Sequence, residues 1–375
     1  MKLKTAVASV FTLLLFQCAS YIPVRILKPA ELDIPPVKKV AVMDFDMNGS
    51  WSFWYDNKSL SLTDLAVKVV QKQLGMEQET RPDPKTAYSG GDLSTRLISG
   101  LVQNGHYTVL ERAELNKILD EHKLSMSGLI DENQSVQIGQ MAGVEALIIG
   151  SGNYNSTDGG EWKEFLKVTK RKVMNADSSY TEIADTTVEN KFEAKRTVNM
   201  EVTYRIVEVS SGRVVASATN RDFAVFTSVK YDETEAYKTL PDWSVGVQQI
   251  VDRLVQRTVL QIAPHYVSQS RKIMGGKSPQ MKTALEYAKK DMIGDAKGLW
   301  EEVISTDIPK LEKDRIAATY NMGVYWELSG DLDQADQCFE TCFKKTGKAV
   351  YLNERQRIKA RKQEIERLRK QNATE

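Results

Sequence analysis

Cysteine and histidine are both scarce in this sequence. Each occurs three times among 375 residues. With so few cysteines, disulfide bonds do not hold the fold together. His106, His122 and His265 lie far apart, without the spacing typical of metal ligands. The sequence therefore predicts neither a disulfide scaffold nor a metal site.

An excess of charge and the common catalytic motifs are also missing. The formal net charge is +1, which gives no indication of nucleic-acid binding. Neither a phosphate-binding glycine loop nor a Gly-x-Ser-x-Gly motif occurs. Asp44 and Asp46 flank Phe45 at a strand end, where a lone aspartate pair is typical of a cap or turn. We expect a protein that is not an enzyme, needs no cofactor and binds no nucleic acid.

The apolar run at the N-terminus is short. Residues 6–16 are apolar or small and follow the basic stretch 1–4. The run cannot span a hydrocarbon core of about 30 Å as a helix, but it suits the central region of a signal peptide. It ends at Leu15-Phe16-Gln17-Cys18, which resembles a bacterial lipobox. We expect a signal peptide over 1–17 and lipidation of Cys18. An ordinary signal peptide with a chance cysteine is the alternative.

The segment after Cys18 contains four prolines within residues 18–38. Proline disfavours regular structure, so these residues are predicted to form a lipidated tether. The absence of aspartate directly after Cys18 favours an anchor in the outer membrane that faces the periplasm. Residues 37–45 are predicted to form a buried strand, because 40–43 and Phe45 make up a short apolar run.

Residues 46–91 form a long excursion with an aromatic cluster. The cluster consists of Trp51, Phe53, Trp54 and Tyr55. These side chains either contact a membrane or interface, or pack against the folded body. Both interpretations stay open.

Residues 92–150 have an α/β pattern. Apolar residues recur at helical spacing from Asp92 onward, and Gly105 ends this helix. A strand over 107–110, helices over 113–123 and 136–142, and a strand over 146–150 follow. This alternation predicts helices packed on a sheet.

A polar insertion is expected over residues 151–197. Beyond it, residues 198–206 alternate strictly between apolar and polar, as in a half-buried strand. A turn at 210–212 and a strand over 214–218 complete a hairpin. A second possible strand covers 223–231, and an amphipathic helix covers 247–262.

The C-terminal third is predicted to be helical. Ala335 and Phe339, with Gly323 and Trp326 upstream, have the alternation of small and large residues that resembles a tetratricopeptide repeat. Ala296, Trp300 and Val303 match a second unit more weakly. We assign residues 281–352 to such repeats and 353–375 to a basic terminal helix. Its charges are expected to form a solvated helical face; contact with lipid head groups or an acidic partner is the alternative.

The stretch 89–154 resembles the curli production assembly/transport (CsgG) family. The matching residues are Ser94 to Leu97 and Tyr107 to Arg112, followed by Gly139, Gly143 and Gly150. The resemblance implies an α+β fold over 39–265, with a three-layer core around a mixed sheet. The α-helical tetratricopeptide-like domain would follow it. Glu111 and Arg112 lie at a strand-to-helix junction, where we expect a structural role.

Known members of that family form rings of lipidated subunits at the outer membrane. The resemblance implies two hairpins per subunit in one large β-barrel, between Tyr154 and Val198 and between Arg221 and Val247. In the second, Trp243, Val245 and Val247 would form a short partner strand. Residues 163–174 are not apolar throughout in either register, so the sequence leaves barrel formation open.

The resulting functional expectation is a homo-oligomer in the outer membrane that secretes or assembles extracellular or surface polymers. A secreted or envelope protein would be its partner. The alternative is a periplasmic scaffold or regulator lipoprotein that binds envelope proteins through its helical repeats, without a pore.

Overall fold

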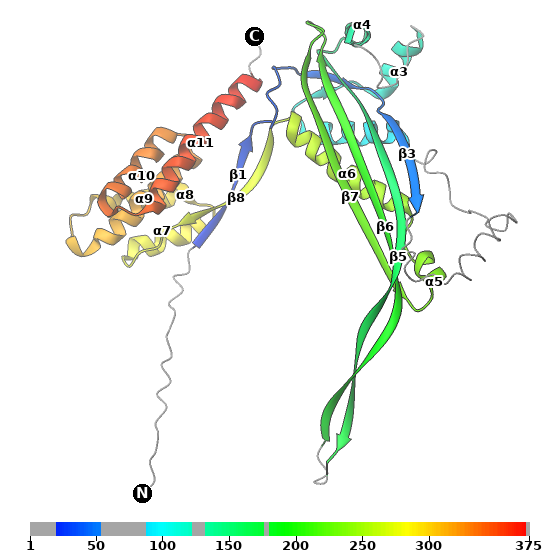
Figure 1. The fold of residues 1–375 in the computed structure, drawn as a ribbon. Helices are drawn as coiled ribbons and strands as arrows, with labels where there is room; N and C mark the ends of the chain where they lie inside the picture. The colour runs from blue at the N-terminus through cyan, green and yellow to red at the C-terminus, as the bar shows by residue number, and fades with distance from the viewer. Residues whose placement is uncertain (1–19, 54–87, 122–131, 176–179, 373–375) are drawn as a thin grey trace, which may run out of the picture. The chain divides into compact units, whose positions relative to one another are not determined.

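A computed structural model describes residues 20–53, 88–121, 132–175 and 180–372 (Figure 1). The chain divides into two compact units. The sheet unit comprises Ala30–Pro264 and Lys370–Glu375, and the helical unit comprises Met1–Pro29 and His265–Arg369. Each unit is described below by itself.

The sheet unit is built on a mixed sheet with the strand order β4-β2-β5-β6-β7. The bounds are β2 (Lys39–Val42), β4 (Thr108–Val109), β5 (Ala146–Met174), β6 (Tyr180–Glu208) and β7 (Val214–Lys230). β2 is parallel to β4 and β5, whereas β5, β6 and β7 are antiparallel. β3 (Asp46–Phe53) lies parallel to β5, at the start of the segment expected to be a long excursion.

Alternating apolar residues of β2 and β5 face two separate cores. Val40 and Ile148 belong to a core with helices α2 (Gly90–Asn104) and α6 (Trp243–Ile262). Ala41 and Ile149 face the opposite core with α3 (Arg112–Glu121) and α4 (Glu132–Ala142). Successive strand residues point to opposite faces, so a fully apolar strand needs a helix layer on each side. The expected three-layer core is confirmed.

Local capping explains why α2 begins and ends where it does. Ser89 is its N-cap and accepts a hydrogen bond from the amide of Asp92. Gly105 ends the helix at φ 76°, the left-handed conformation that favours glycine. Leu93, Leu97 and Leu101 are buried against the sheet, as their spacing predicts.

The region expected to be a polar insertion is regular. β5 and β6 are each 29 residues long and pair without interruption from Ala146↔Glu208 to Met174↔Tyr180. The expected strand over 198–206 is only the last part of β6. The prediction of a separate polar insertion over 151–197 is therefore wrong, because these residues continue the sheet.

The second expected hairpin is wrong. β7 extends to Lys230 and is followed by a short helix, α5 (Glu233–Lys238). Trp243, Val245 and Val247 lie in the first turns of α6, not in a strand. Asp242 caps that helix by accepting a hydrogen bond from the Ser244 amide, so the helix begins before the expected Val247.

The helical unit begins with a two-stranded sheet. β1 (Ser20–Lys28) is antiparallel to β8 (His265–Ile273), from Ser20↔Ile273 to Lys28↔His265. This corrects the expected tether over residues 20–28, whereas residues 29–38 form neither a strand nor a helix. Pro23 is compatible with β1 because the strand has a partner on one side only, so no ladder donor is needed on the other.

Five α-helices follow β8. They are α7 (Pro279–Lys289), α8 (Ile293–Ser305), α9 (Glu312–Leu328), α10 (Leu332–Thr346) and α11 (Ala349–Asn372), with a short 3-10 helix over Pro309–Leu311. The expected helical region is confirmed. None of the helices within the described ranges is both long and apolar enough to cross a membrane.

The basic terminal helix begins earlier than expected and buries one side. α11 begins at Ala349, and Tyr351, Ile358 and Leu368 are buried. Its arginines form ion pairs with acidic residues of neighbouring helices, such as Arg355 with Asp336 at 2.8 Å. One side of α11 therefore packs into the unit, and exposed residues such as Lys359, Lys362 and Arg369 lie on its solvated face.

Candidate functional site: the β5–β6 hairpin

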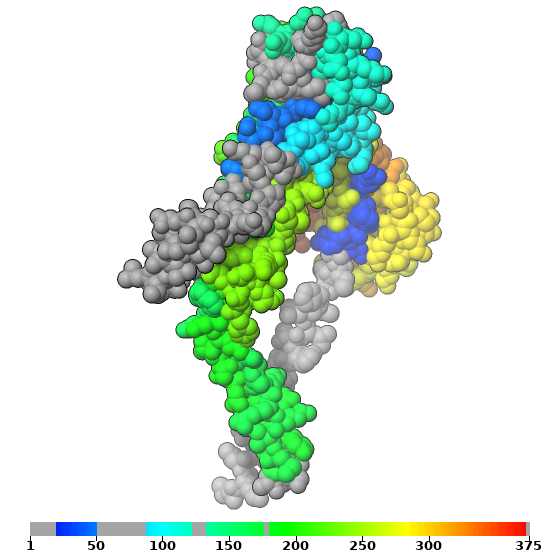
Figure 2. Space-filling model, turned by 90° about the vertical axis from the view of Figure 1, so that its right-hand side faces the viewer, coloured from blue at the N-terminus to red at the C-terminus, as the bar shows by residue number. Residues whose placement is uncertain are grey.

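The most distinctive feature of the sheet unit is a two-stranded arm. β5 and β6 continue beyond β7 and α5 as a narrow hairpin (Figures 1 and 2). Beyond the pair Phe192↔Lys230, β6 loses its partner β7. An isolated two-stranded hairpin is at best marginally stable in water. Contacts between the side chains of the arm must therefore provide the stabilisation that packing against helices provides in the rest of the sheet.

One face of the arm continues the α2–α6 core face of the sheet. The same alternate positions that bury Tyr154 and Val198 reach Leu166, Val168 and Val188 further out. There the exposed fractions are 74% for Leu166, 59% for Val168 and 57% for Val188. Met174 and Tyr180 end this apolar stripe; the polar or charged residues Glu164, Lys170, Lys172, Glu182, Thr186 and Asn190 interrupt it.

A buried ion pair lies where the arm leaves the sheet. Asp158 and Arg196 are directly opposite on β5 and β6. The guanidinium donates to both carboxylate oxygens, Nε to Oδ1 and Nη2 to Oδ2, each at 2.7 Å. Its Nη1 also donates to the carbonyl of Pro241 at 2.6 Å. The pair thus fixes the base of the arm to the loop between α5 and α6.

Aromatic rings pack next to this ion pair. Phe192 is fully buried, with the ring of Trp162 at 5.5 Å and that of Tyr237 from α5 at 5.6 Å. Ala236 and Leu240 complete this small core. α5 therefore covers the first part of the apolar face and leaves the stripe from Leu166 onward uncovered.

The opposite face of the arm is charged. Lys163, Lys167 and Arg171 recur every fourth residue of β5, and each pairs diagonally with an acidic residue of β6. The pairs are Lys163 with Glu193, Lys167 with Glu189 at 2.7 Å, and Arg171 with Asp185 at 2.7 Å. We call these three pairs the charged ladder. Cross-strand pairs of opposite charge stabilise a hairpin modestly.

Glu189 is the centre of the charged ladder. It accepts hydrogen bonds from Lys167 and from the hydroxyl of Tyr231, just after β7, and lies 3.1 Å from Lys191 Nζ. The bonds from Lys167, Tyr231 and Lys191, in that order, lower the pKa of Glu189 to about 2. Glu189 thereby joins all three strands at the end of β7.

Acidification is expected to weaken this junction in a defined pH window. The folded pKa of Glu189 lies below the ordinary value of 4.5, so its contribution to stability is complete above pH 4.5. That contribution is lost as the pH falls to about 2. A carboxyl NMR titration should give a midpoint near 2, rising toward 4.5 in the double variant K167M/K191M. An unchanged midpoint in that variant would contradict the assignment.

The predicted strand-to-helix junction is in place. Arg112 is the first residue of α3 and pairs with Asp44 at 2.6 Å. Its Nη1 donates to the Gly91 carbonyl and to Thr95 Oγ1, both at 2.9 Å. Glu111 contributes through its backbone carbonyl, which accepts from the amides of Glu114 and Leu115. The junction thus connects β2, α2 and α3.

The other predicted site residues either lie outside the described part of the chain or belong to the helical unit. Cys18, Trp54 and Tyr55 lie outside the described residues, and so do the side chains of Trp51 and Phe53. In the helical unit, Ala335 and Phe339 are fully buried.

Gly323 and Trp326 lie on α9, which packs against α10. A Cβ on Gly323 would lie 2.7 Å from the Phe339 ring, so glycine permits the close approach of the two helices. Trp326 is partly buried in the core of the helical unit, and the Lys297 ammonium lies 5.1 Å from its ring. The repeat-packing residues are therefore core residues.

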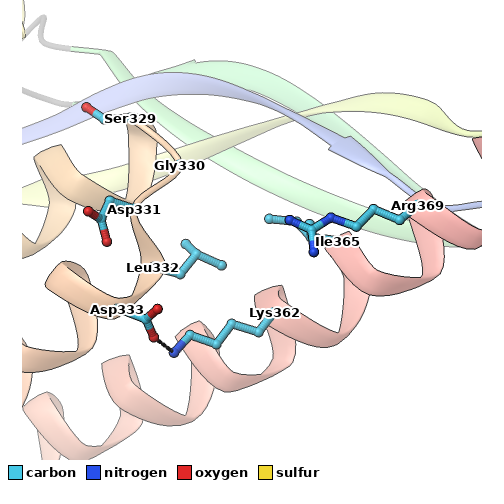
Figure 3. A pocket seen from close by; sticks show the side chains of 8 residues that line it. All are labelled: Ser329, Gly330, Asp331, Leu332, Asp333, Lys362, Ile365 and Arg369. Atoms are coloured by element: carbon cyan, nitrogen blue, oxygen red, sulfur yellow. Dashed lines mark hydrogen bonds and ion pairs between the residues drawn. The ribbon is translucent and has the colours of Figure 1, made fainter.

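An open pocket of about 580 Å³ lies in the helical unit (Figure 3). The turn before α10 forms one wall and α11 the other. Leu332 and Ile365 supply apolar surface, and Lys362 reaches Asp333 at 2.6 Å. The lining holds two acidic residues, Asp331 and Asp333, and two basic residues, Lys362 and Arg369, so the pocket does not favour a ligand of one sign.

Sequence reasoning missed Asp158, Arg196 and the charged ladder. A usable signal was present: Phe192, Ala194 and Val198 alternate as buried residues do, with Arg196 in phase among them. A charge at a buried position of a strand requires a partner. The ladder also has a signal, since cations recur every fourth residue along β5.

Comparisons with known proteins agree with this architecture. The sequence model of the curli production assembly/transport component CsgG matches residues 39–274. A domain of unknown function, DUF6340, matches residues 282–367. No curated protein matches the chain.

Two solved structures illustrate the similarity. The LpoB C-terminal domain from Escherichia coli is 11% identical, with 50% of this chain and 84% of that chain covered at a TM-score of 0.22. A PelC dodecamer from Paraburkholderia phytofirmans is 12% identical, with 64% and 98% covered at a TM-score of 0.22. These likenesses are too low to support any inference about function.

The family match covers more than half of the 375 residues and includes β2, the Arg112 junction, the β5–β6 arm and α6. The chain belongs to the CsgG family.

Proposed function

We propose that this protein is an outer-membrane lipoprotein that faces the periplasm and acts as a homo-oligomer in the secretion or assembly of extracellular or surface polymers. Membership of a family described by curli assembly and transport supports the process. The lipobox-like Leu15 to Cys18 supports the anchor. The proposal assigns the protein no catalytic role and no cofactor.

The observation that carries the oligomeric part is the exposed apolar stripe of the arm. Leu166, Val168 and Val188 are more than half exposed, although they continue a core-facing register. An exposed apolar surface held in fixed geometry favours association with another surface. The charged ladder keeps the arm extended and leaves the stripe available for a neighbouring subunit.

Subunit association can be tested on the stripe directly. The full-length protein, extracted in detergent, should sediment as an oligomer. The single variants L166K and V168K should each weaken association by roughly tenfold or more, since an unpaired ammonium in an apolar contact costs over ~1.4 kcal/mol. The matched control is T169K, on the charged face of the same strand. A monomeric wild type, or equal effects of stripe and control variants, would refute this role.

The anchor is tested separately at Cys18. The wild type should incorporate labelled palmitate and remain in the outer-membrane fraction. C18S should incorporate none and remain unprocessed, whereas C338S should behave like the wild type. Equal acylation of wild type and C18S would show that Cys18 is not the modified residue.

A second candidate function is a scaffold that binds envelope proteins through the helical unit. The pocket between α10 and α11 favours it, because Leu332 and Ile365 offer apolar contact within an open groove (Figure 3). Cross-linking the full-length protein in cells should then yield a defined adduct. That adduct should be lost in I365D and kept in T169K. Loss in both variants would exclude the pocket as the binding site.

A further inference from the structure

The two-stranded sheet of the helical unit has one buried and one exposed face. Ile22, Val24 and Ile26 of β1, with Ile273 of β8, lie in the core of the helical unit. The opposite face presents four cross-strand pairs: Tyr21↔Lys272, Pro23↔Ser270, Arg25↔Ser268 and Leu27↔Tyr266. We call these eight residues the β1–β8 outer face.

The outer face combines aromatic rings with cations. Tyr21 and Tyr266, at opposite ends, are 58% and 62% exposed. The Arg25 guanidinium lies 4.9 Å from the centre of the Tyr266 ring, and Lys272 is opposite Tyr21. The eight residues include no carboxylate. Tyrosine with lysine or arginine is the composition of protein surfaces at the membrane–water interface.

Charge is separated between the two sides of β8. Arg271 points to the buried side, where it pairs with Glu327 at 3.1 Å and Glu354 at 2.8 Å. Lys272 points to the outer face, like Arg25. The outer face therefore carries two cations and attracts lipid phosphates, whereas the acidic groups that balance Arg271 lie on the buried side.

Chain length puts this face close to the proposed anchor. Cys18 is two residues before Ser20, the first residue of β1. An extended chain spans at most about 3.6 Å per residue, so the Cys18 backbone lies within about 7 Å of the strand. Acyl chains on Cys18 would hold Tyr21 and Lys272 at the level of the head groups.

We propose that the β1–β8 outer face lies flat on the lipid head groups of the membrane in which Cys18 is anchored. This inference rests on the anchoring proposed above. Tyr21 and Tyr266 are six strand positions apart along the ribbon, about 20 Å, so an upright strand would leave Tyr266 in water. A flat orientation places both rings at the interface and both cations on phosphates.

A fluorescent probe on each half of the face tests the orientation. S270C lies opposite Pro23 near the anchor, S268C opposite Arg25 further along, and S329C on the exposed turn between α9 and α10 is the control. Burial raises the pKa of Cys338 to about 11 and of Cys342 to about 12, which slows the labelling of both native thiols at neutral pH. The acylated full-length protein is labelled with an environment-sensitive fluorophore and added to vesicles of phosphatidylethanolamine and phosphatidylglycerol.

Fluorescence at 268 and 270 should rise roughly twofold or more and be quenched by head-group spin labels, while the probe at 329 stays unchanged. R25Q/K272Q should reduce the response at 268 on these anionic vesicles, although the acyl chain still holds the protein there. A response at 270 alone would mean an upright strand and overturn the proposal.

Mass spectrometry of the N-terminal peptide separates this inference from the anchor. An acylated protein with no response at 268 or 270 overturns the flat contact and leaves the anchor standing. A protein without acyl chains overturns the anchor, and the flat contact with it.

Discussion

Replacing Asp158 by asparagine is expected to lower the free energy of unfolding by about 3–5 kcal/mol. Asparagine keeps the shape of the side chain but removes its charge, so Arg196 would stay buried without its counter-ion. The side chains are 0% exposed for Asp158 and 10% for Arg196, which excludes compensation by water. Denaturant unfolding followed by tryptophan fluorescence measures the effect.

The control for Asp158 is an exposed pair in the same sheet. Arg221 and Glu201 pair between β7 and β6, with side chains 76% and 34% exposed. E201Q should cost less than about 1 kcal/mol. The double variant D158L/R196M should regain most of the loss, because it leaves no buried charge. If D158N costs no more than E201Q, the pair does not hold the base of the arm.

The second large effect is expected in the helical unit, where four charges are clustered. Arg271 and Arg357 share the carboxylates of Glu327 and Glu354. The hydroxyl of Tyr320 also donates to Glu354 at 3.0 Å. Glu327 is only 3% exposed. R271M would leave two carboxylates with one arginine, and we expect a loss of about 3–5 kcal/mol.

The pH dependence of this variant gives an independent test. Burial raises the pKa of Glu354, but the hydrogen bond and charge of Arg271, with the charge of Arg357, outweigh it, so the pKa lies below its ordinary value. The stabilisation is therefore present above about pH 4.5 and lost as the pH falls. Unfolding of wild type and R271M should converge on acidification.

R355M is the matched control for R271M. Arg355 of α11 pairs with Asp336 of α10 in the same unit, but the side chains are 31% and 29% exposed. The loss should stay near 1 kcal/mol or below. Equal losses for R271M and R355M would show that burial of the four charges adds nothing.

Periodicity predicted the elements that have one buried face or stripe. Leu93, Leu97 and Leu101 of α2 recur at helical spacing because only one side of the helix meets the sheet. Residues 198–206 alternate because helices cover one face of β6 there. In both cases the burial of a single face imposes a pattern on the sequence.

The arm escaped this reasoning for the opposite reason. Beyond Phe192 the hairpin has no covering layer, so neither face is required to be uniformly apolar, and mixed residues such as Lys170 and Val188 are tolerated.

β1 does alternate, with Ile22, Val24 and Ile26 buried, but Pro23 argued against a strand. Its partner β8 follows more than 230 residues later, and the local sequence does not predict pairing between segments so far apart.

At the candidate site, the role of Arg112 could be predicted from sequence, whereas the partner of Arg196 could not. Arg112 follows a strand in a motif that resembles the family, so a junction role could be expected from sequence. The ion-pair partner of Arg196 could not be predicted from sequence, because Asp158 lies opposite it only once β5 and β6 are paired in their observed register.

The sequence by itself determined the family, the α+β core with its helical C-terminal region and the outline of the main helices, because these follow from local periodicity and local motifs. Only the tertiary structure decided that residues 151–197 extend the sheet, that α5 and α6 replace a second hairpin, and that the segment after Cys18 is a strand. Pairing between distant segments and the burial of charge depend on which residues meet in space, and one-dimensional patterns carry little of that information.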